Sequence, residues 1–264
     1  MRNSLKIENI QYSLENLNNS VQKWQTSIDG KYLLRYPTVY IINDKKHENN
    51  FEVYVGETAD IRNRTRQHLN VDTKLKPFWE DFSTSSNSSM YVIGHEMFNK
   101  SLTLDIENRL MQYLLSVDNI SRVHNSRTNQ QNEYYTSEKL DEIFSDIWGT
   151  LNKKNKVLFP IESIIKDSAI FKASPFHKLT QEQINAKEEI LNKIKESIIL
   201  DEEGQLLIVE GEAGSGKTVL MSTLLYELKK YNLNLDKDLD IHLLVNHNEH
   251  VTIYNQIATK LGIT

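Results

Sequence analysis

The sequence predicts a mixed α/β protein, and three observations lead to this fold class. Residues 38–43 and 51–56 are β-rich runs separated by a polar turn, which indicates a hairpin. Residues 101–117 carry the apolar periodicity of an amphipathic helix. Over residues 205–247 a buried strand, a Gly-rich loop, a helix and a second buried strand follow one another, as in a parallel sheet. We expect a small α+β domain followed by the beginning of a parallel α/β domain.

The composition limits the kinds of protein that fit this fold. The chain has 264 residues, enough for two domains with a core in each. Its net charge of −5 argues against a constitutive nucleic-acid coat protein, so any nucleic-acid site must be local. The absence of cysteine excludes disulfides and thiolate zinc sites and leaves Asp, Glu and His as metal ligands. With no signal peptide and no apolar run long enough to span a bilayer, we expect a soluble cytoplasmic protein.

The first half of the chain reads as an arm followed by a compact domain. Residues 1–35 are predicted to form an N-terminal helical arm, because apolar side chains recur there at spacings of two to four. After the hairpin, Asp60 is the N-cap candidate of a helix. A strand at residues 90–95, the amphipathic helix, a polar loop and a further helix complete a domain over residues 36–150.

The second half begins with residues 151–178, which are predicted to be a linker because their periodicity is poor and their turn signals are dense. Residues 179–264 then follow the order expected for the N-terminal part of a RecA-like P-loop domain. The expected elements are a helix over 179–198, a strand over 205–211, a loop over 211–218, a helix after it and a strand over 240–247.

The loop GEAGSGKT at residues 211–218 satisfies the G-x-x-x-x-G-K-[ST] pattern of phosphate-binding loops. Its backbone amides would cradle phosphates, Lys217 would reach the outer phosphates, and Thr218 would ligate Mg²⁺. The pattern therefore predicts ATP with Mg²⁺ as a ligand. The expected nucleotide-binding residues of the loop are Gly211, Gly214, Ser215, Gly216, Lys217 and Thr218.

Two features around this loop concern nucleotide recognition and hydrolysis. The stretch LTQEQ at residues 179–183 resembles the adenine-reading glutamine motif of superfamily 1 helicases, which would make Gln183 an adenine contact. Alternatively, Thr180 and Gln183 form a capping box for the helix, and both roles can hold together. Hydrolysis also needs a second carboxylate at the end of another strand, but residues 240–247 do not end in one. We expect a chain that is the front part of a longer protein, or truncated, and a poor ATPase alone.

The hairpin and the two helices that follow carry a second set of motifs. The tripeptides TVY at 38–40 and YVG at 54–56, followed by Arg64, His68 and Glu107, resemble the GIY-YIG endonuclease family. The resemblance covers about residues 36–140 and implies a metal-dependent nuclease domain. Thr38 replaces the first Gly of the family pattern, and thirteen residues separate the tripeptides, more than is usual in the family. Neither departure removes a chemical group.

The resemblance also implies a role for each motif residue. Tyr40 is the candidate general base and Tyr54 its neighbour, Gly56 is a tight backbone position, and Arg64 clamps the phosphate. The other implied residues are His68 as an auxiliary acid-base group, Glu107 as the ligand of Mg²⁺ or Mn²⁺, and a downstream Asn, for which Asn125 is preferred over Asn129. A Tyr base fits this set because nearby cations favour the phenolate. Taken singly, the tyrosines could be half-buried core residues and Glu107 and His68 ordinary surface or structural residues.

The helix over residues 60–69 divides its three arginines. Arg64 and His68 are four apart and share one side, whereas Arg62 and Arg66 lie on the other. Arg62 and Arg66 are therefore expected to hold nucleic-acid backbone phosphates or to face solvent. Base-reading side chains are expected from loops such as STSSNSS at residues 83–89.

The pairing of these two regions resembles bacterial proteins in which such a nuclease precedes a Schlafen-type helicase-like domain. It implies hydrolysis of DNA phosphodiester bonds, gated or driven by ATP in the full-length protein, in DNA processing or defence against foreign DNA. Two alternatives remain open. The chain could be an ATP-switched binding protein whose nuclease-like module does not cleave, or its substrate could be RNA.

Overall fold

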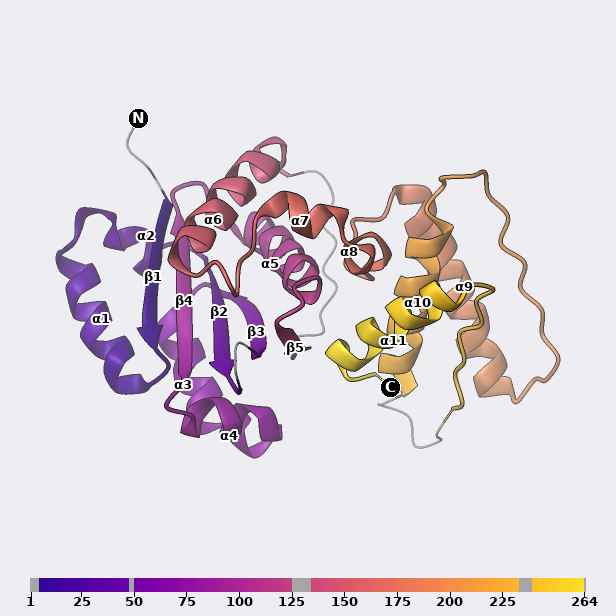
Figure 1. The fold of residues 1–264 in the computed structure, drawn as a ribbon, viewed down its shortest axis with the longest axis horizontal. Coiled ribbons are helices and arrows are strands. Elements are labelled where there is room, and N and C mark those ends of the chain that lie inside the picture. Colours follow the sequence, from indigo (N-terminus) through magenta and orange to yellow (C-terminus); the bar gives the residue numbers. More distant parts are fainter. Residues whose placement is uncertain (1–4, 48–49, 125–133, 233–238, 264) are drawn as a thin grey trace.

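A five-stranded mixed sheet forms the centre of the computed structural model, which describes residues 5–47, 50–124, 134–232 and 239–263 (Figure 1). The strand order is β1-β4-β2-β3-β5. Strand β5 pairs parallel with β3, and the other neighbours are antiparallel. This mixed sheet confirms the predicted fold class. The strands are β1 Leu5–Gln11, β2 Thr38–Lys45, β3 Phe51–Thr58, β4 Ser88–His95 and β5 Ile120–Val123.

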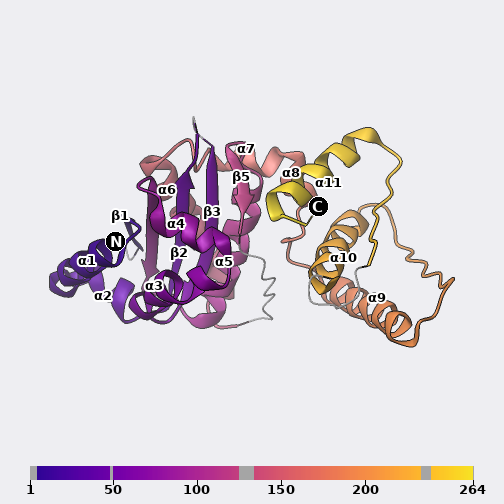
Figure 2. The ribbon, with the colours of Figure 1, turned by 90° about the horizontal axis from the view of Figure 1, so that it is seen from below.

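Helices cover both faces of the sheet (Figure 2). Helices α5 and α6 pack on one face, and α1, α3 and α4 pack on the other. None of the helices in the described ranges has both the length and the apolar character needed to cross a membrane. The helices are α1 Leu14–Thr26, α2 Lys31–Leu34, α3 Ile61–Asn70, α4 Pro77–Thr84, α5 Lys100–Leu115, α6 Leu140–Lys154, α7 Glu162–Asp167, α8 Ala169–Ala173, α9 Gln181–Leu200, α10 Lys217–Asn232 and α11 Asn248–Leu261.

The central strands read as nearly continuous apolar runs because both of their faces are buried. In β2, Val39 and Ile41 point to the α5 side, whereas Tyr40 and Ile42 point to the α3 side. This alternation follows from the two-residue period of a strand. It places the first tyrosine of the hairpin on the face covered by α3.

The N-terminal segment differs from the helical arm that its sequence predicts. Residues Leu5–Gln11 form β1, which pairs with β4 so that Ile7 lies opposite Ile93. The prediction was wrong here because Leu5 and Ile7 are two apart, which is the period of a strand, and the edge of β4 offers a partner. Helix α1 begins only after Ser13, whose side chain caps it.

Several other local predictions are confirmed. Helix α3 begins after Asp60, whose carboxylate accepts hydrogen bonds from the backbone N–H groups of Arg62 at 3.0 Å and Asn63 at 3.1 Å. Strand β4 and helix α5 cover the residues expected for them. The linker predicted over residues 151–178 is wrong. This segment includes α7 and α8, and it buries Leu158 and Phe159 in the same core as α5, so it is part of the folded domain.

The two strands expected in the C-terminal region do not form. Residues 205–210 and 240–245 have no strand pairing, and their apolar side chains are exposed, with Leu206 at 80% and Leu244 at 90%. A parallel pair is stable only when further strands and helices cover it. Among the described residues of this region, α9 and α10 pack on each other instead, and α11 packs against α5 and β5.

Helix α11 docks against the first region rather than standing apart from it. The Lys260 ammonium is buried and donates to the carbonyls of Leu115 at 3.0 Å and Val117 at 2.7 Å, beyond the C-terminal end of α5. Arg122 of β5 donates to the Thr259 carbonyl at 3.1 Å. Burial lowers the pKa of Lys260 to about 8. The end of α11 is therefore fixed on α5 and β5.

Candidate active site

Tyr40 and Tyr54 lie side by side on strands β2 and β3. Their ring centroids are 6.1 Å apart, and Tyr40 is only 1% exposed. Gly56 lies directly opposite Tyr40 in the antiparallel register. A Cβ atom on Gly56 would lie 2.4 Å from the Tyr40 hydroxyl, so the phenol ring occupies the space that the glycine leaves free. This is the tight position that the sequence predicted, and its cause is the neighbouring tyrosine.

Helix α3 places Arg64 and His68 against the hydroxyl of Tyr40. The Tyr40 Oη atom lies 2.7 Å from His68 Nε2, and Arg64 Nε donates to the same oxygen at 3.4 Å. The two helical residues can both reach Tyr40 because they are four apart and share one side of the helix. The structure thus brings together four predicted residues from two strands and one helix.

Two further residues hold His68, and sequence reasoning missed both. The imidazole Nδ1 lies 2.7 Å from Asp72 Oδ2, and Arg64 Nη1 lies 3.9 Å from the same oxygen. The His68 ring also stacks on Trp79, with 3.7 Å between the centroids. A signal for Asp72 was available, because it follows His68 by four residues just past the end of α3. Trp79 reaches the site from α4, and no local pattern could have shown this.

The hydrogen-bond partners fix the tautomer of His68. Because an ionised carboxylate can only accept, His68 Nδ1 must carry the hydrogen that faces Asp72. In the neutral ring, Nε2 is then an acceptor, and the Tyr40 hydroxyl donates to it. The three side chains form a series from a phenol through an imidazole to a carboxylate.

Burial controls the protonation states of this series. It raises the pKa of Tyr40 well above its ordinary value, while Arg64 opposes this increase and Glu107 adds to it. Burial also raises the pKa of Tyr54. For His68, burial and then the Arg64 charge lower the pKa to about 4 against the effect of Asp72. At neutral pH, both phenols are protonated and the imidazole is neutral.

The phosphate loop lies apart from this site, before helix α10. Gly214 and Gly216 have positive φ angles of 82° and 81°, which favour glycine. The Lys217 ammonium donates to the loop carbonyls of Gly211 at 2.7 Å and Glu212 at 2.8 Å. The ammonium therefore lies inside the turn, where phosphate oxygens would bind. Thr218 is exposed in the first turn of α10.

Gln183 connects helix α9 to this loop. Thr180 and Gln183 form the predicted capping box, with Gln183 Oε1 accepting from the Thr180 N–H at 2.9 Å. In addition, Gln183 Nε2 donates to the Ser215 carbonyl at 2.8 Å. The capping role is confirmed, and the contact with adenine stays a prediction.

Comparison with known protein families finds a match in each of the two regions that carry the motifs. Residues 36–85 match the model of the GIY-YIG catalytic domain. This chain contains a GIY-YIG domain. Residues 204–263 match Schlafen group 3, DNA/RNA helicase domain. A GIY-YIG domain therefore precedes a helicase-like region, as the motifs predicted. The same search finds no significant match among curated proteins or solved structures.

The matched residues of the GIY-YIG domain include Tyr40, Tyr54, Arg64 and His68, whereas Glu107 lies beyond them. Glu107 is on α5, is only 4% exposed, and contributes to the raised pKa values of Tyr40 and Tyr54. Asn125, and Asn129 as the less favoured candidate, lie outside the residues that the structure describes.

A carboxylate in this position suits a hard divalent cation such as Mg²⁺ or Mn²⁺, which prefers oxygen ligands. Within the described ranges, no three His, Asp or Glu side chains come together as metal ligands. The family resemblance implies Glu107 as the protein ligand of such a cation, and this stays a prediction. At sites that act on phosphates, Mg²⁺ usually binds one or two carboxylates and keeps water and phosphate oxygens in its shell.

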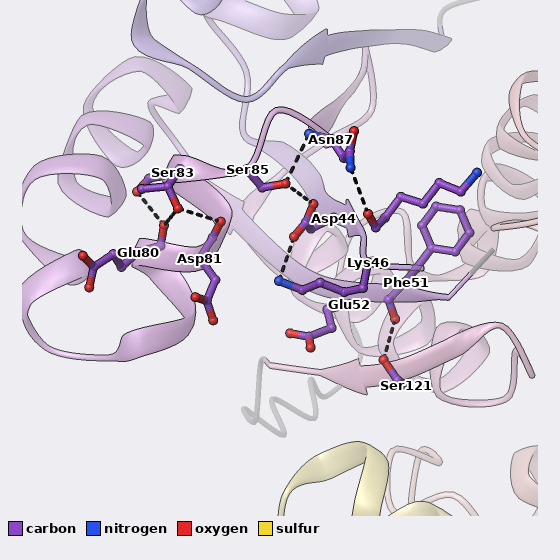
Figure 3. A network of polar contacts seen from close by, with 12 residues as sticks. Asp44, Lys46, Phe51, Glu52, Glu80, Asp81, Ser83, Ser85, Asn87 and Ser121 are labelled. Carbon is purple, nitrogen blue, oxygen red and sulfur yellow. Dashed lines mark hydrogen bonds and ion pairs between the residues drawn. The ribbon is translucent and has the colours of Figure 1, made fainter. Parts of the chain in front are cut away.

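The Ser-rich loop of the GIY-YIG domain is anchored by its own side chains (Figure 3). Ser85 donates to the buried carboxylate of Asp44 at 2.6 Å, and the other oxygen of Asp44 pairs with Lys46 at 2.8 Å. Asn87 donates to the Lys45 carbonyl at 3.3 Å. These contacts tie the loop before β4 to the end of β2. Ser85 and Asn87 are thus engaged in fixing the hairpin.

Proposed function

We propose that the GIY-YIG domain hydrolyses phosphodiester bonds of DNA with the help of Mg²⁺ or Mn²⁺. The observation that carries this proposal is the series Tyr40, His68 and Asp72 beside the Arg64 guanidinium. A general base needs a route for the proton that it receives, and this series supplies one. Arg64, at 27% side-chain exposure, is the most open of the four, so a phosphate would approach from its side.

The chemistry follows from the protonation states. As water attacks phosphorus, Tyr40 Oη takes a proton from the water and passes its own proton to His68 Nε2. The new O–P bond forms as the bond from phosphorus to the leaving oxygen breaks. Asp72 stabilises the imidazolium that results. Arg64 holds the phosphate by charge and hydrogen bonds, and the phosphate charge offsets the effect by which Arg64 lowers the pKa of His68.

Glu107 would hold the divalent cation close to both tyrosines. When bound, the cation would stabilise negative charge on the leaving oxygen. The carboxylate also shapes the site without the cation, because it disfavours a phenolate at Tyr40. A cation on Glu107 would cancel this effect, which makes Tyr40 a better base only when the site is complete.

We propose further that the helicase-like region binds ATP with Mg²⁺ at Lys217 and Thr218, with Gln183 beside the loop, and that ATP gates cleavage. A nuclease joined to a helicase-like region suits DNA processing or defence against foreign DNA.

Plasmid nicking tests the proposed nuclease. Purified protein should nick supercoiled DNA with Mg²⁺ or Mn²⁺ and not with EDTA, and Glu107→Ala and Arg64→Ala should abolish nicking. Cleavage by Glu107→Ala at the wild-type rate would refute the role of that carboxylate. Parallel assays with single-stranded DNA, duplex DNA and RNA identify the substrate, and binding without cleavage on all three would instead favour a non-cleaving module.

A further inference from the structure

A cavity of about 570 Å³ lies between the N-terminal helices and the beginning of α3. Helices α1 and α2 form one wall, and residues 59–62 form the other. Its lining includes Trp24, Ile28, Lys31, Arg35, Asp60 and Arg62. The cavity thus joins a segment that precedes the matched GIY-YIG residues to the helix that carries Arg64 and His68.

The cations of this cavity are not neutralised by the protein. In the part of the chain that the structure describes, Lys31, Arg35 and Arg62 form no ion pair with a carboxylate. The Nε atom of Arg62 is buried without a hydrogen-bond partner. A buried donor without a partner is unfavourable, and an oxygen of a ligand would supply the missing acceptor.

The carboxylate in the cavity wall is already occupied. Asp60 caps α3, and its two oxygens accept from the N–H groups of Arg62 and Asn63 and from the Asn63 amide. Its negative charge remains but is outnumbered by the three cations of the lining, Lys31, Arg35 and Arg62, so the cavity is positive on balance. This contrasts with the net charge of −5 for the whole chain.

The position of the cavity relates it to the nuclease site. Arg62 and Arg64 are two residues apart on α3, which corresponds to a rise of about 3 Å along the helix, and they point to different sides. Successive phosphates of a nucleic-acid strand are spaced by a few Å along the helix axis. Because Arg62 and Arg64 point to different sides, a strand held at Arg64 has to cross the N-terminal turn of α3, about 10 Å wide, to present phosphates to the cavity.

We propose that Lys31, Arg35 and Arg62 bind backbone phosphates of a nucleic-acid strand that flank the bond to be cut. Helices α1 and α2 then form part of the nucleic-acid-binding surface. This inference rests on the proposed nuclease function, because it needs a nucleic acid at Arg64. It adds a binding role for the N-terminal segment, which lies outside the family match.

The test measures binding by the full chain without cleavage. In a Tyr40→Phe background with EDTA, fluorescence anisotropy follows a labelled DNA duplex over a range of salt concentrations. The double variant Lys31→Ala/Arg35→Ala should weaken binding about 5- to 10-fold and reduce the salt slope by about two, since each phosphate contact contributes about one. Lys153→Ala/Lys154→Ala on α6 is the charge-matched control, because α6 covers the other sheet face.

The outcomes separate this inference from the proposed function. Equal affinities and salt slopes for the two double variants, with DNA bound normally, would overturn only the role of the cavity. Failure of the Tyr40→Phe protein itself to bind DNA or RNA would overturn the nuclease proposal as well. Circular dichroism checks that the variants are folded, and Lys31→Gln/Arg35→Gln, which removes the charges but retains a longer polar side chain than alanine, should reproduce the loss.

Discussion

The phenol oxygen of Tyr40 lies 2.7 Å from Nε2 of His68, and Nδ1 of the same imidazole lies 2.7 Å from Asp72. These contacts link strand β2 to helix α3 and to the residues just after it. The imidazole has one orientation available, because Trp79 stacks on its face and both of its nitrogens are engaged. The geometry of the candidate base is therefore fixed before any substrate arrives.

Tyr40→Phe should reduce cleavage by a factor of about 10²–10⁴ while preserving the fold, because only the hydroxyl is removed. The measurement is single-turnover nicking together with thermal unfolding. Tyr91→Phe is the matched control, since Tyr91 is also a buried strand tyrosine but faces α5. Equal loss in both variants would point to a structural effect and contradict the role of Tyr40.

Asp72→Asn should slow cleavage by about 10-fold or more by disturbing the tautomer of His68. An asparagine amide can donate to Nδ1, which would move the imidazole hydrogen to Nε2 and remove the acceptor for Tyr40. Nitrogen chemical shifts of His68 report the tautomer directly. Asp81→Asn, an exposed change on α4, serves as the control. An unchanged rate with a changed tautomer would disprove the proton route.

Acid should destabilise the protein partly through His68. Its pKa is about 4 in the folded protein and about 6.5 when unfolded, so the unfolded chain binds more protons between these values. The free energy of unfolding should fall by up to roughly 3 kcal/mol from pH 6.5 to pH 4, and this contribution should be constant above pH 6.5. Urea unfolding of the wild type and of His68→Gln at several pH values measures the contribution of His68 to the free energy of unfolding. An equally steep decrease in the variant would assign the effect to other groups.

Gly56→Ala should cost about 1–3 kcal/mol of stability and also reduce cleavage, because the new Cβ atom would displace the Tyr40 ring. Gly149→Ala on α6 is the matched substitution, since nothing lies within 4 Å of its added Cβ. It should stabilise the helix by about 0.5–1 kcal/mol. Thermal melts and nicking rates measure both effects. A stable, fully active Gly56→Ala would show that Tyr40 can move freely.

Gln183→Glu separates the two roles of this residue. Glutamate keeps the capping box but cannot donate to the Ser215 carbonyl or read adenine through an amide N–H. We expect normal thermal stability without nucleotide and a weaker stabilisation by ATP, with a reduced preference for ATP over GTP. Thermal shifts with each nucleotide provide the measurement. Unchanged preference would leave Gln183 as a cap alone.

Local patterns predicted much of the fold. The hairpin of β2 and β3, the start of α3 at Asp60, and α5 follow from strand and helix periods and from capping chemistry. The shared side of Arg64 and His68 also followed, because residues four apart lie on one side of α3, whereas their convergence with Tyr40 was implied by the family resemblance and not by a local pattern. These features depend on neighbours close in sequence.

The remaining features depend on partners far along the chain. Strand β1 forms because β4 is available, whereas residues 205–210 have the composition of a strand but no partner among the described residues. Trp79 reaches His68 only after α4 has folded against the sheet. These features therefore depend on tertiary contacts, which local propensity does not predict.

Helix α5 connects the candidate active site to the C-terminal helix α11. Its end is attached to Lys260 of α11, and Glu107 lies midway along it. A helix transmits displacement along its axis much as a stiff rod does. A displacement of α11 would therefore act on the helix that carries Glu107, whereas Tyr40 and His68 lie on β2 and α3.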